Sequence, residues 1–284
     1  MAGPSCQRNP RRGIRARRKT PRTDSRSTLF SKDTSPVEVG MTAFVVVGDR
    51  FSKFAARTGA LTVSQVIQKI RGDGMPGATK LVGGQGLEEC DWDRIRDEIA
   101  HRGTSGEVEI HPLTHGPLSD RSETHKHNPH NVLVAGLELV GDHEFEAALR
   151  LHNDQEFQLD HMGVHVQGMI VLEAARQMYL AVCERYYPSE GEIHLFDKME
   201  TTFRNFLYPL ETRLRSAVTA GTSDLGRPVF DVRTEFRQAG LHIAEVRTVG
   251  TALSAQSLER KEQRGAERAL RHTLKNAPAP DPAR

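Results

Sequence analysis

A long apolar helix with charges inside it is the feature that most constrains this chain. Residues 168–187 predict a helix of about five turns with apolar side chains on most of its circumference, so other elements must wrap it. Pro188 and Gly191 end it. Glu173 and Arg176 interrupt the apolar run, and burying either charge without a partner is costly. The sequence therefore indicates a site on this helix.

The loop before this helix carries two histidines, His161 and His165. Asp160 precedes His161, where a carboxylate can set the tautomer of an imidazole. Neighbouring residues of an extended loop point in opposite directions, however. Substrate contact and a structural hydrogen-bonding role therefore both stay open for each histidine.

Composition limits the class of protein. The net charge is +2, but residues 1–40 hold ten Lys and Arg against three Asp and Glu, which leaves 29 basic and 34 acidic residues elsewhere. The body of the chain thus gives no reason to expect a nucleic-acid partner. Cys6, Cys90 and Cys183 have no paired spacing, which predicts neither disulfides nor a zinc site and favours a reducing, cytoplasmic compartment. No apolar run is long enough to span a membrane.

The two ends of the chain have little apolar content. Residues 1–40 are rich in Arg, Ser and Pro and predict a disordered basic extension. A basic arm, a transit peptide or a true start at Met41 are the alternatives. Residues 254–284 have three leucines among many charges, and we expect a solvated helix and a loose tail.

Residues 41–103 predict a small α/β unit of unknown role. Strands are expected at 43–47 and 80–82 and a helix at 62–70, and Asp91 is a candidate N-cap for a further helix. The loop at residues 83–86, Gly-Gly-Gln-Gly, follows the second strand. It is interpreted as a connector, because a phosphate-binding loop would need a different spacing and a lysine.

Residues 104–124 lack periodicity and predict a linker. Five histidines lie in or just after it. They have neither helical pairing nor neighbouring Cys and carboxylate ligands, so no metal site is expected. These histidines are His111, His115, His125, His127 and His130.

Residues 125–253 predict the main domain. Strands are expected at 132–134, 137–140 and 145–151 before the long helix, and at 193–202, 210–220, 228–236 and 242–253 after it. A hairpin, one long buried helix and four antiparallel strands form the order of a hotdog fold. The fold class predicted is α+β: a central helix wrapped by an antiparallel sheet and preceded by the small α/β unit.

Three blocks of this domain, residues 127–133, 160–165 and 168–177, resemble the A-factor biosynthesis hotdog family (AfsA type). The resemblance covers residues 125–253. It implies an acyltransferase that joins a β-ketoacyl group, delivered as an acyl carrier protein thioester, to the hydroxyl of dihydroxyacetone phosphate. This is the first committed step towards γ-butyrolactone signals. No cofactor is expected, and the matching positions imply Glu173 and Arg176 as active-site residues.

The residues fit such chemistry in specific ways. Glu173 and Arg176 share a helix face, where an ordinary structural ion pair is the alternative. Glu173 would be the general base for the attacking hydroxyl or would orient it, and Arg176 would hold phosphate or an oxyanion. The backbone N–H groups of Gly168 and Met169, at the helix N-terminus, would be oxyanion donors.

The sequence also departs from known patterns. The family typically has two hotdog repeats, whereas this chain has one, so we expect a homodimer. Dehydratases of this fold share the Gly168, Glu173, Ala174 pattern, but their catalytic histidine position is Leu159 here, which counts against a dehydratase.

Candidate second cations for a phosphate are Lys198, Arg204 and Arg213, and Asn205 and Phe206 resemble family positions only weakly. Two other classes of function stay open. One is another hotdog acyl-thioester enzyme, either a dehydratase or a thioesterase. The other is a non-catalytic acyl-binding module.

Overall fold

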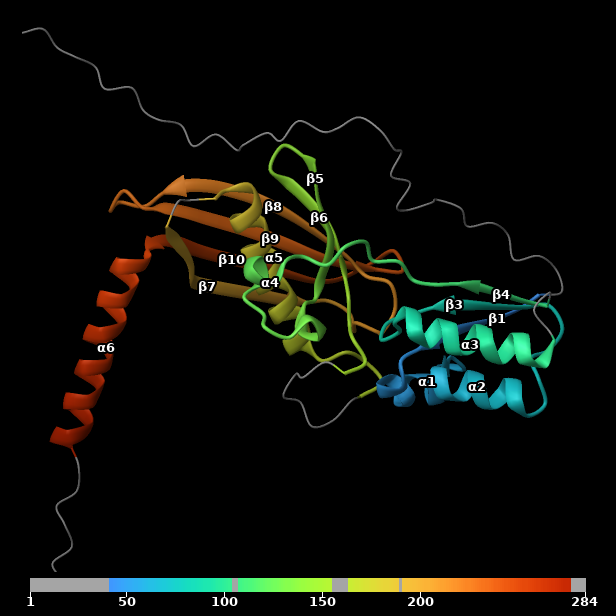
Figure 1. Cartoon of the computed structure of the whole chain (residues 1–284). Helices are drawn as coiled ribbons and strands as arrows, with labels where there is room; N and C mark the ends of the chain where they lie inside the picture. Colours follow the sequence, from blue (N-terminus) through green and yellow to red (C-terminus); the bar gives the residue numbers. More distant parts are fainter. Residues whose placement is uncertain (1–40, 104–106, 155–162, 189–190, 277–284) are drawn as a thin grey trace, which may run out of the picture.

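The computed structural model describes residues 41–103, 107–154, 163–188 and 191–276. They form an α/β unit, a larger unit in which a helix crosses an antiparallel sheet, and a terminal helix that extends from that sheet (Figure 1). The extension predicted at 1–40, the tail from residue 277 onward and His161 lie outside the described residues.

The first unit contains β1 (Thr42–Val47), α1 (Ser52–Thr58), β2 (Leu61–Thr62), α2 (Val63–Arg71), β3 (Thr79–Gly83), α3 (Glu89–Arg102) and β4 (Val108–His111). Its four strands are parallel, in the order β2-β1-β3-β4. Thr62 and Gln65 form a capping box that starts α2. The apolar side chains of α2 and α3 pack over Val46 and Leu81 in one buried cluster.

Two sequence predictions for this region are wrong in detail. The strand β4 lies inside the predicted linker 104–124, where Val108 pairs with Thr79 of β3. The helix α3 is capped at Glu88 rather than at Asp91. The Asp91 carboxylate instead accepts a hydrogen bond of 3.1 Å from the Glu88 N–H, which is the returning half of a capping box.

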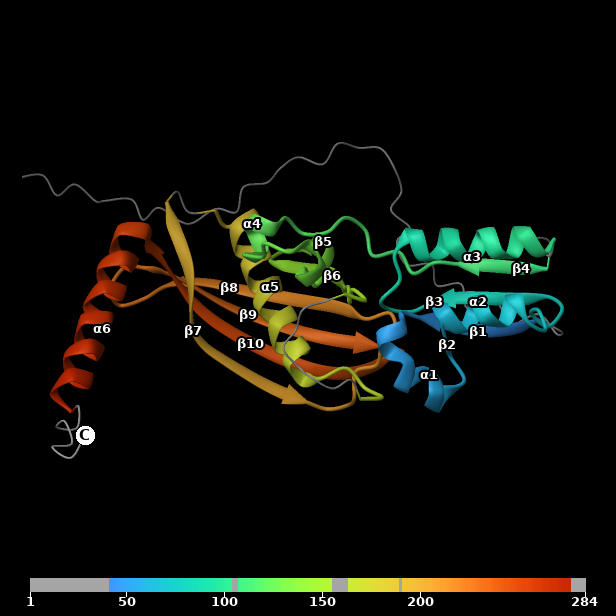
Figure 2. The same cartoon turned by 60° about the horizontal axis from the view of Figure 1, so that its bottom comes forward.

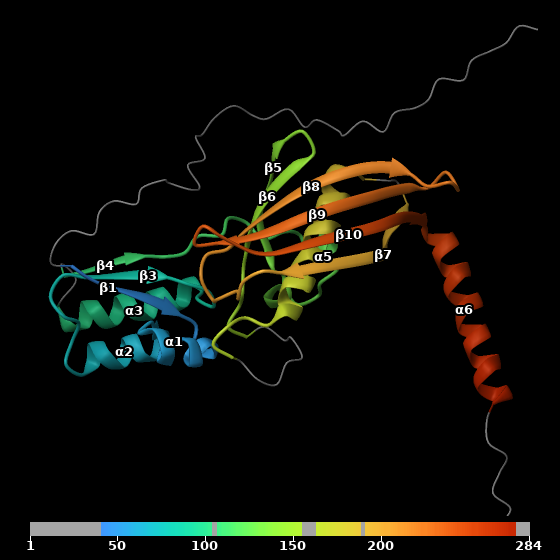
Figure 3. The same cartoon turned by 180° about the vertical axis from the view of Figure 1, so that it is seen from behind.

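The larger unit has the predicted hotdog arrangement. Its strands are β5 (Val134–Gly141), β6 (Glu144–Leu149), β7 (Glu192–Phe203), β8 (Arg213–Thr222), β9 (Pro228–Gln238) and β10 (Leu241–Ser254). They form one antiparallel sheet, in the order β5-β6-β8-β9-β10-β7. The helix α5 (Gly168–Tyr186) crosses one face of this sheet. Figure 3 views the sheet from its opposite face, with α5 behind the strands.

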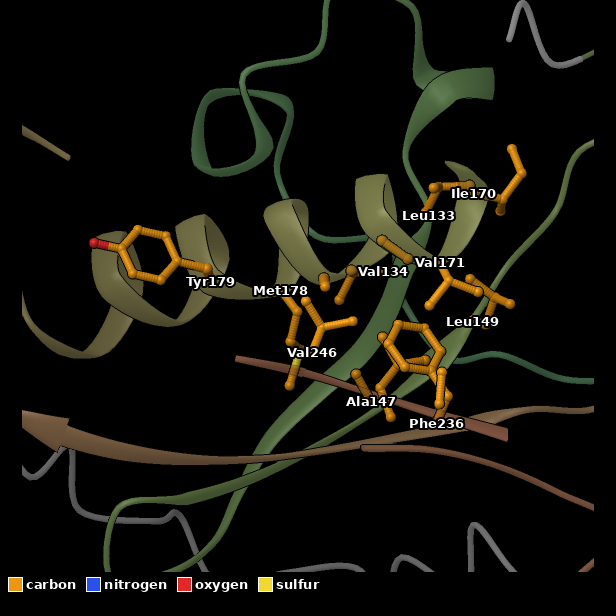
Figure 4. Packing of buried hydrophobic residues seen from close by; sticks show 14 of the residues in the cluster. Leu133, Val134, Ala147, Leu149, Ile170, Val171, Met178, Tyr179, Phe236 and Val246 are labelled. Carbon is orange, nitrogen blue, oxygen red and sulfur yellow. The ribbon is translucent and has the colours of Figure 1, made fainter. Parts of the chain in front are cut away.

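The core of this unit lies between α5 and the sheet. Val171 and Met178 point from the helix towards Phe236 and Val246 of the strands (Figure 4). The helix is buried at most positions from Ile170 to Cys183, which confirms that other elements wrap it. Such burial of large side chains is worth about 1.5–3 kcal/mol each, so the packing of α5 on the sheet stabilises the unit.

A glycine in β10 sets how closely α5 approaches the sheet. A Cβ at Gly250 would lie 2.2 Å from the Tyr179 Oη and 2.3 Å from the Leu195 carbonyl oxygen. Gly250 also adjoins a shift in the register between β10 and β7. The fully buried Tyr179 ring therefore fits only because this position has no side chain.

The two units meet at the carboxyl edge of the parallel sheet. Gln85 is fully buried; its Nε2 donates to the Leu149 carbonyl at 2.9 Å, and its Oε1 accepts from the Leu151 N–H at 2.8 Å. A Cβ at Gly84 would lie 2.7 Å from the Pro209 carbonyl oxygen. The carboxyl edge is the usual ligand site of such sheets, but here the second unit fills it. The loop at 83–86 is thus a contact between units, rather than a plain connector or a phosphate cradle.

The first unit also contributes to the second unit's core. Val47, Phe51 and Phe54 are buried in the same apolar cluster as α5 and the antiparallel sheet. The two units therefore share one hydrophobic core across their junction, in addition to the hydrogen bonds of Gln85.

The helix α6 (Ala255–Lys275) follows β10 directly. Ser254 caps it, its side chain accepting a hydrogen bond from the Ser257 N–H. No residue of α6 is buried, which confirms the predicted solvated helix. Figure 2 shows α6 and the α/β unit at opposite ends of the antiparallel sheet. None of the helices in the described part of the chain is long and apolar enough to cross a membrane.

Candidate functional site

A pocket lies at the N-terminus of α5. Its volume is about 420 Å³, and its lining is mainly apolar, with Val171, Phe203 and Phe206 among the lining residues. His165 and Gly168, two of the predicted site residues, also line it. Met169 is not among the lining residues and is exposed. The pocket has the size and polarity for an acyl chain.

Close contacts with two phenylalanine rings surround Gly168 and His165 at the rim of the pocket. A Cβ at Gly168 would lie 3.0 Å from the Phe203 ring, so glycine lets this ring approach the first turn of α5. The His165 ring lies 4.7 Å from the Phe206 ring. Phe203 is 54% exposed and Phe206 is 63% exposed. The first N–H groups of a helix have no intrahelical acceptor, and their partial positive charge lies at the mouth of this pocket.

Glu173 and Arg176 lie on a different face of α5. Glu173 stands two positions after Val171, which turns its direction by about 200°, and neither charged residue lines the pocket. The Arg176 guanidinium binds the Glu173 carboxylate through two hydrogen bonds of 2.8 Å. The structure thus joins the predicted pair but separates it from Gly168 and His165 within one chain.

Two further side chains bind the same carboxylate. The Lys126 Nζ lies 2.7 Å from the Glu173 Oε1, and the Gln177 Nε2 donates to that oxygen at 2.9 Å. Gln177 also accepts a hydrogen bond from the Leu133 N–H at 2.7 Å. The segment before β5 is therefore fastened to α5 around this cluster. We call Lys126, Glu173, Arg176 and Gln177 the Glu173 cluster.

The electrostatics favour one of the two predicted roles of Glu173. Burial opposes its charge, but hydrogen bonds from Arg176, Lys126 and Gln177 outweigh burial and lower the pKa to about 2. A carboxylate with so low a pKa is a weak base, and four donated contacts already occupy its oxygens. Orienting the cations and the acceptor therefore suits Glu173 better than abstracting a proton.

Lys126 is the functional candidate that sequence reasoning missed. Of the three cations considered in its place, Lys198 pairs with Glu200 at 2.7 Å. Arg204 lines the apolar pocket at the N-terminus of α5, and Arg213 lines a separate pocket. The available signal was the position of Lys126, one residue before the family-like block at 127–133. Its pairing with α5 depends on the tertiary fold.

A second polar cluster contains His130, one of the five histidines for which the sequence predicts no metal site. His130 stacks on His152 with ring centroids 3.7 Å apart and planes 7° apart, and Asp154 lies close enough to complete a set of three metal-type ligands. Parallel rings do not direct their in-plane lone pairs to one point. His152 Nδ1 also accepts from the Asp154 N–H at 2.9 Å, so this cluster is organised for hydrogen bonding.

Comparison with known proteins agrees with the fold. The sequence model of the A-factor biosynthesis hotdog domain (AfsA) matches residues 119–254. The comparison with curated proteins gave no match.

Solved structures with a similar fold include a conserved protein from Pseudomonas aeruginosa, at 20% identity and a TM-score of 0.32 over 42% of this chain and 89% of that one. A thioesterase from Haemophilus influenzae has 14% identity and a TM-score of 0.31 over 42% and 77%. An uncharacterized protein from Pyrococcus horikoshii has 16% identity and a TM-score of 0.33 over 50% and 95%. Similarity at this level carries no information about activity.

The matched segment begins six residues before the region of sequence resemblance at 125–253 and includes α5, the antiparallel sheet and the Glu173 cluster. Residues 119–254 are therefore a hotdog domain of the A-factor biosynthesis family.

Proposed function

We propose that this protein is an acyltransferase that moves a β-ketoacyl group from an acyl carrier protein thioester to a hydroxyl of a dihydroxyacetone phosphate-like acceptor. In this reaction the thioester C–S bond breaks and a C–O ester bond forms. The hydroxyl proton ends on the released thiol. The reaction would serve the synthesis of a butyrolactone-type signal or a related secondary metabolite.

The observation that carries this proposal is the Glu173 cluster. Arg176 and Lys126 are largely buried, with side chains 23% and 22% exposed, and one carboxylate holds both, so the cluster has a net positive charge. Such a charge favours a phosphate-bearing acceptor, whose oxygens match the planar donors of arginine. A water-dependent thioesterase would have no need of this second cation.

We infer that the working site combines two copies of the chain. The apolar pocket and the Glu173 cluster lie on different faces of α5, so one substrate cannot reach both within one copy. The edge strand β7 is twelve residues long, and a long exposed edge favours pairing with another chain. Phe203, Phe206 and Met169, all more than half exposed, lie near the end of β7 and the start of α5.

A homodimer is accordingly expected in solution. Sedimentation velocity on the whole chain should give a species of twice the chain mass of 31.6 kDa. Mixing copies that carry Gly168→Trp with copies that carry Arg176→Ala should restore part of the activity, because one of the two sites then has an intact pocket and an intact cluster. A stable monomer, or no restoration on mixing, would contradict the shared site.

The activity itself is tested with purified protein, a β-ketoacyl thioester and dihydroxyacetone phosphate. A phosphorylated ester, identified by mass spectrometry together with an equal amount of free thiol, is the expected product. Omitting the acceptor should stop thiol release. Thiol release without acceptor would indicate a thioesterase, loss of water from a hydroxyacyl thioester would indicate a dehydratase, and binding without turnover would indicate an acyl-binding module.

A further inference from the structure

The helix α6 has an arrangement of charge that the proposed reaction does not explain. At 100° per residue, its six Lys and Arg residues fall within an arc of about 100°. Glu259 and Glu262 lie well outside that arc, and Glu267 lies about 20° beyond its edge. The six are Arg260, Lys261, Arg264, Arg268, Arg271 and Lys275. We call them the α6 basic stripe.

The surface next to this stripe is concave. A groove of about 690 Å³ runs between α6 and the turn that joins β8 to β9. Arg227 of that turn lines it together with four cations of the stripe, and no acidic side chain is among the described residues that line it. Leu253 and Gly265 form a small, uncharged part of the lining, which lets a partner approach closely.

The isolated stripe carries an energetic cost. Like charges four residues apart, such as Arg260 with Arg264 and Arg264 with Arg268, destabilise a helix by about 0.2–0.5 kcal/mol per pair. Within α6, the salt bridge of 3.7 Å between Arg271 and Glu267 offsets only part of this repulsion. A polar helix without a buried face needs such pairs or a partner to stay ordered. An anionic partner would offset the repulsion between the cations and would bury one face of α6.

The geometry points to an acidic helix of a partner protein, which we propose docks in this groove. The stripe continues from Arg260 through Arg264, Arg268 and Arg271 to Lys275 at intervals of three or four residues, the same repeat at which carboxylates recur on one face of an acidic helix. Arg227 adds a further cation from the side of the groove.

Two other anionic surfaces fit less well. A membrane would need a broad apolar face opposite the stripe, but there Leu258, Leu270 and Leu274 are interrupted by Glu259 and Glu262. A nucleic acid would extend beyond the stripe over the rest of a chain whose residues after 40 hold more acidic than basic side chains, and would be repelled there. A compact acidic helix would contact the stripe without reaching the acidic surface beyond it.

The choice of partner rests on the proposed function, in which a carrier protein delivers the donor thioester. The probe is therefore an acidic acyl carrier protein bearing its phosphopantetheine arm. The full chain is compared with Arg264→Glu/Arg268→Glu, and with the control Lys53→Glu/Arg57→Glu, an equal charge change on exposed residues of α1. Calorimetry at low and high salt gives the Kd, and circular dichroism checks the helix content.

We expect the stripe variant to weaken carrier binding at least about tenfold and the control less than about twofold, with the difference shrinking at high salt. Turnover of a small acyl-N-acetylcysteamine thioester should be equal in all three proteins. Unchanged carrier binding in the stripe variant overturns the docking site, as does binding of RNA or anionic vesicles in place of the carrier. Specific loss of carrier binding without turnover of either thioester supports the docking site and refutes the proposed reaction.

Discussion

Replacing Arg176 with alanine is expected to lower acyl transfer at least about 100-fold while the chain stays folded. Arg176 supplies the planar donors to the proposed phosphate or oxyanion, and removing one such preorganised donor typically costs two to three orders of magnitude in rate, or about 3–4 kcal/mol. Among the described residues, it also leaves Lys126 as the one cation paired with Glu173. The measurement is kcat and KM for both substrates, with circular dichroism as the test of folding.

The same helix offers a matched control. Arg185 binds Glu123 through its Nε and Nη2, and its side chain is 32% exposed, against 23% for Arg176. Arg185→Ala should therefore cost a comparable amount of stability and leave turnover nearly unchanged. Equal activity losses in the two variants would mean that Arg176 acts only through the stability of α5.

Glu173→Gln gives the same loss for a different reason. Glutamine keeps the shape of the side chain but replaces the carboxylate with a neutral amide. Its single oxygen accepts weaker bonds from Arg176 and Lys126, and its NH2 group accepts none, so both cations lose their fixed positions. Because the pKa of Glu173 is held at about 2, the rate should show no titration of this group near neutral pH. A variant with full activity would remove Glu173 from the site.

The second large effect is expected at the junction between the units. Gln85→Leu should lower the free energy of unfolding by about 2–6 kcal/mol, because the Leu151 N–H and the Leu149 carbonyl lose their partners in a buried interface, at about 1–3 kcal/mol for each. Urea denaturation of the whole chain measures the loss. The Leu210 carbonyl should contribute little, since Thr212 also donates to it.

Gln68→Leu is the matched control for this change. Gln68 is exposed on α2 of the same unit, and surface substitutions of this kind usually stay within about 0.5 kcal/mol. If both variants unfold at the wild-type urea concentration, the hydrogen bonds of Gln85 do not hold the units together. If Gln85→Leu unfolds in two separate transitions, the junction is what makes the units cooperative.

The elements of the hotdog domain were predictable because their signals are local. The apolar circumference of residues 168–187 and the alternation in the last four strands depend only on neighbours in the sequence, and both match α5 and β7 to β10. The two charges in the apolar helix also identified two members of the Glu173 cluster, and their role in catalysis stays a prediction.

The rest depends on contacts between distant residues. Gln85 binds carbonyl groups 64 and 125 residues away, so the sequence of the glycine loop holds no sign of what it contacts. Strand β4 has only two apolar residues, Val108 and Ile110, and is recognisable only through its pairing with β3. Lys126 meets Glu173 because the segment before β5 folds back onto α5.

The shared core determines where a fragment that contains the hotdog domain should begin. The family match begins at residue 119, yet Val47, Phe51 and Phe54 belong to the same apolar cluster as α5 and the antiparallel sheet. A fragment cut at the family boundary would present that surface to water and would be prone to aggregate. The portable module of this protein therefore starts near residue 41, and chimeras with other hotdog domains should exchange the α/β unit together with its partner.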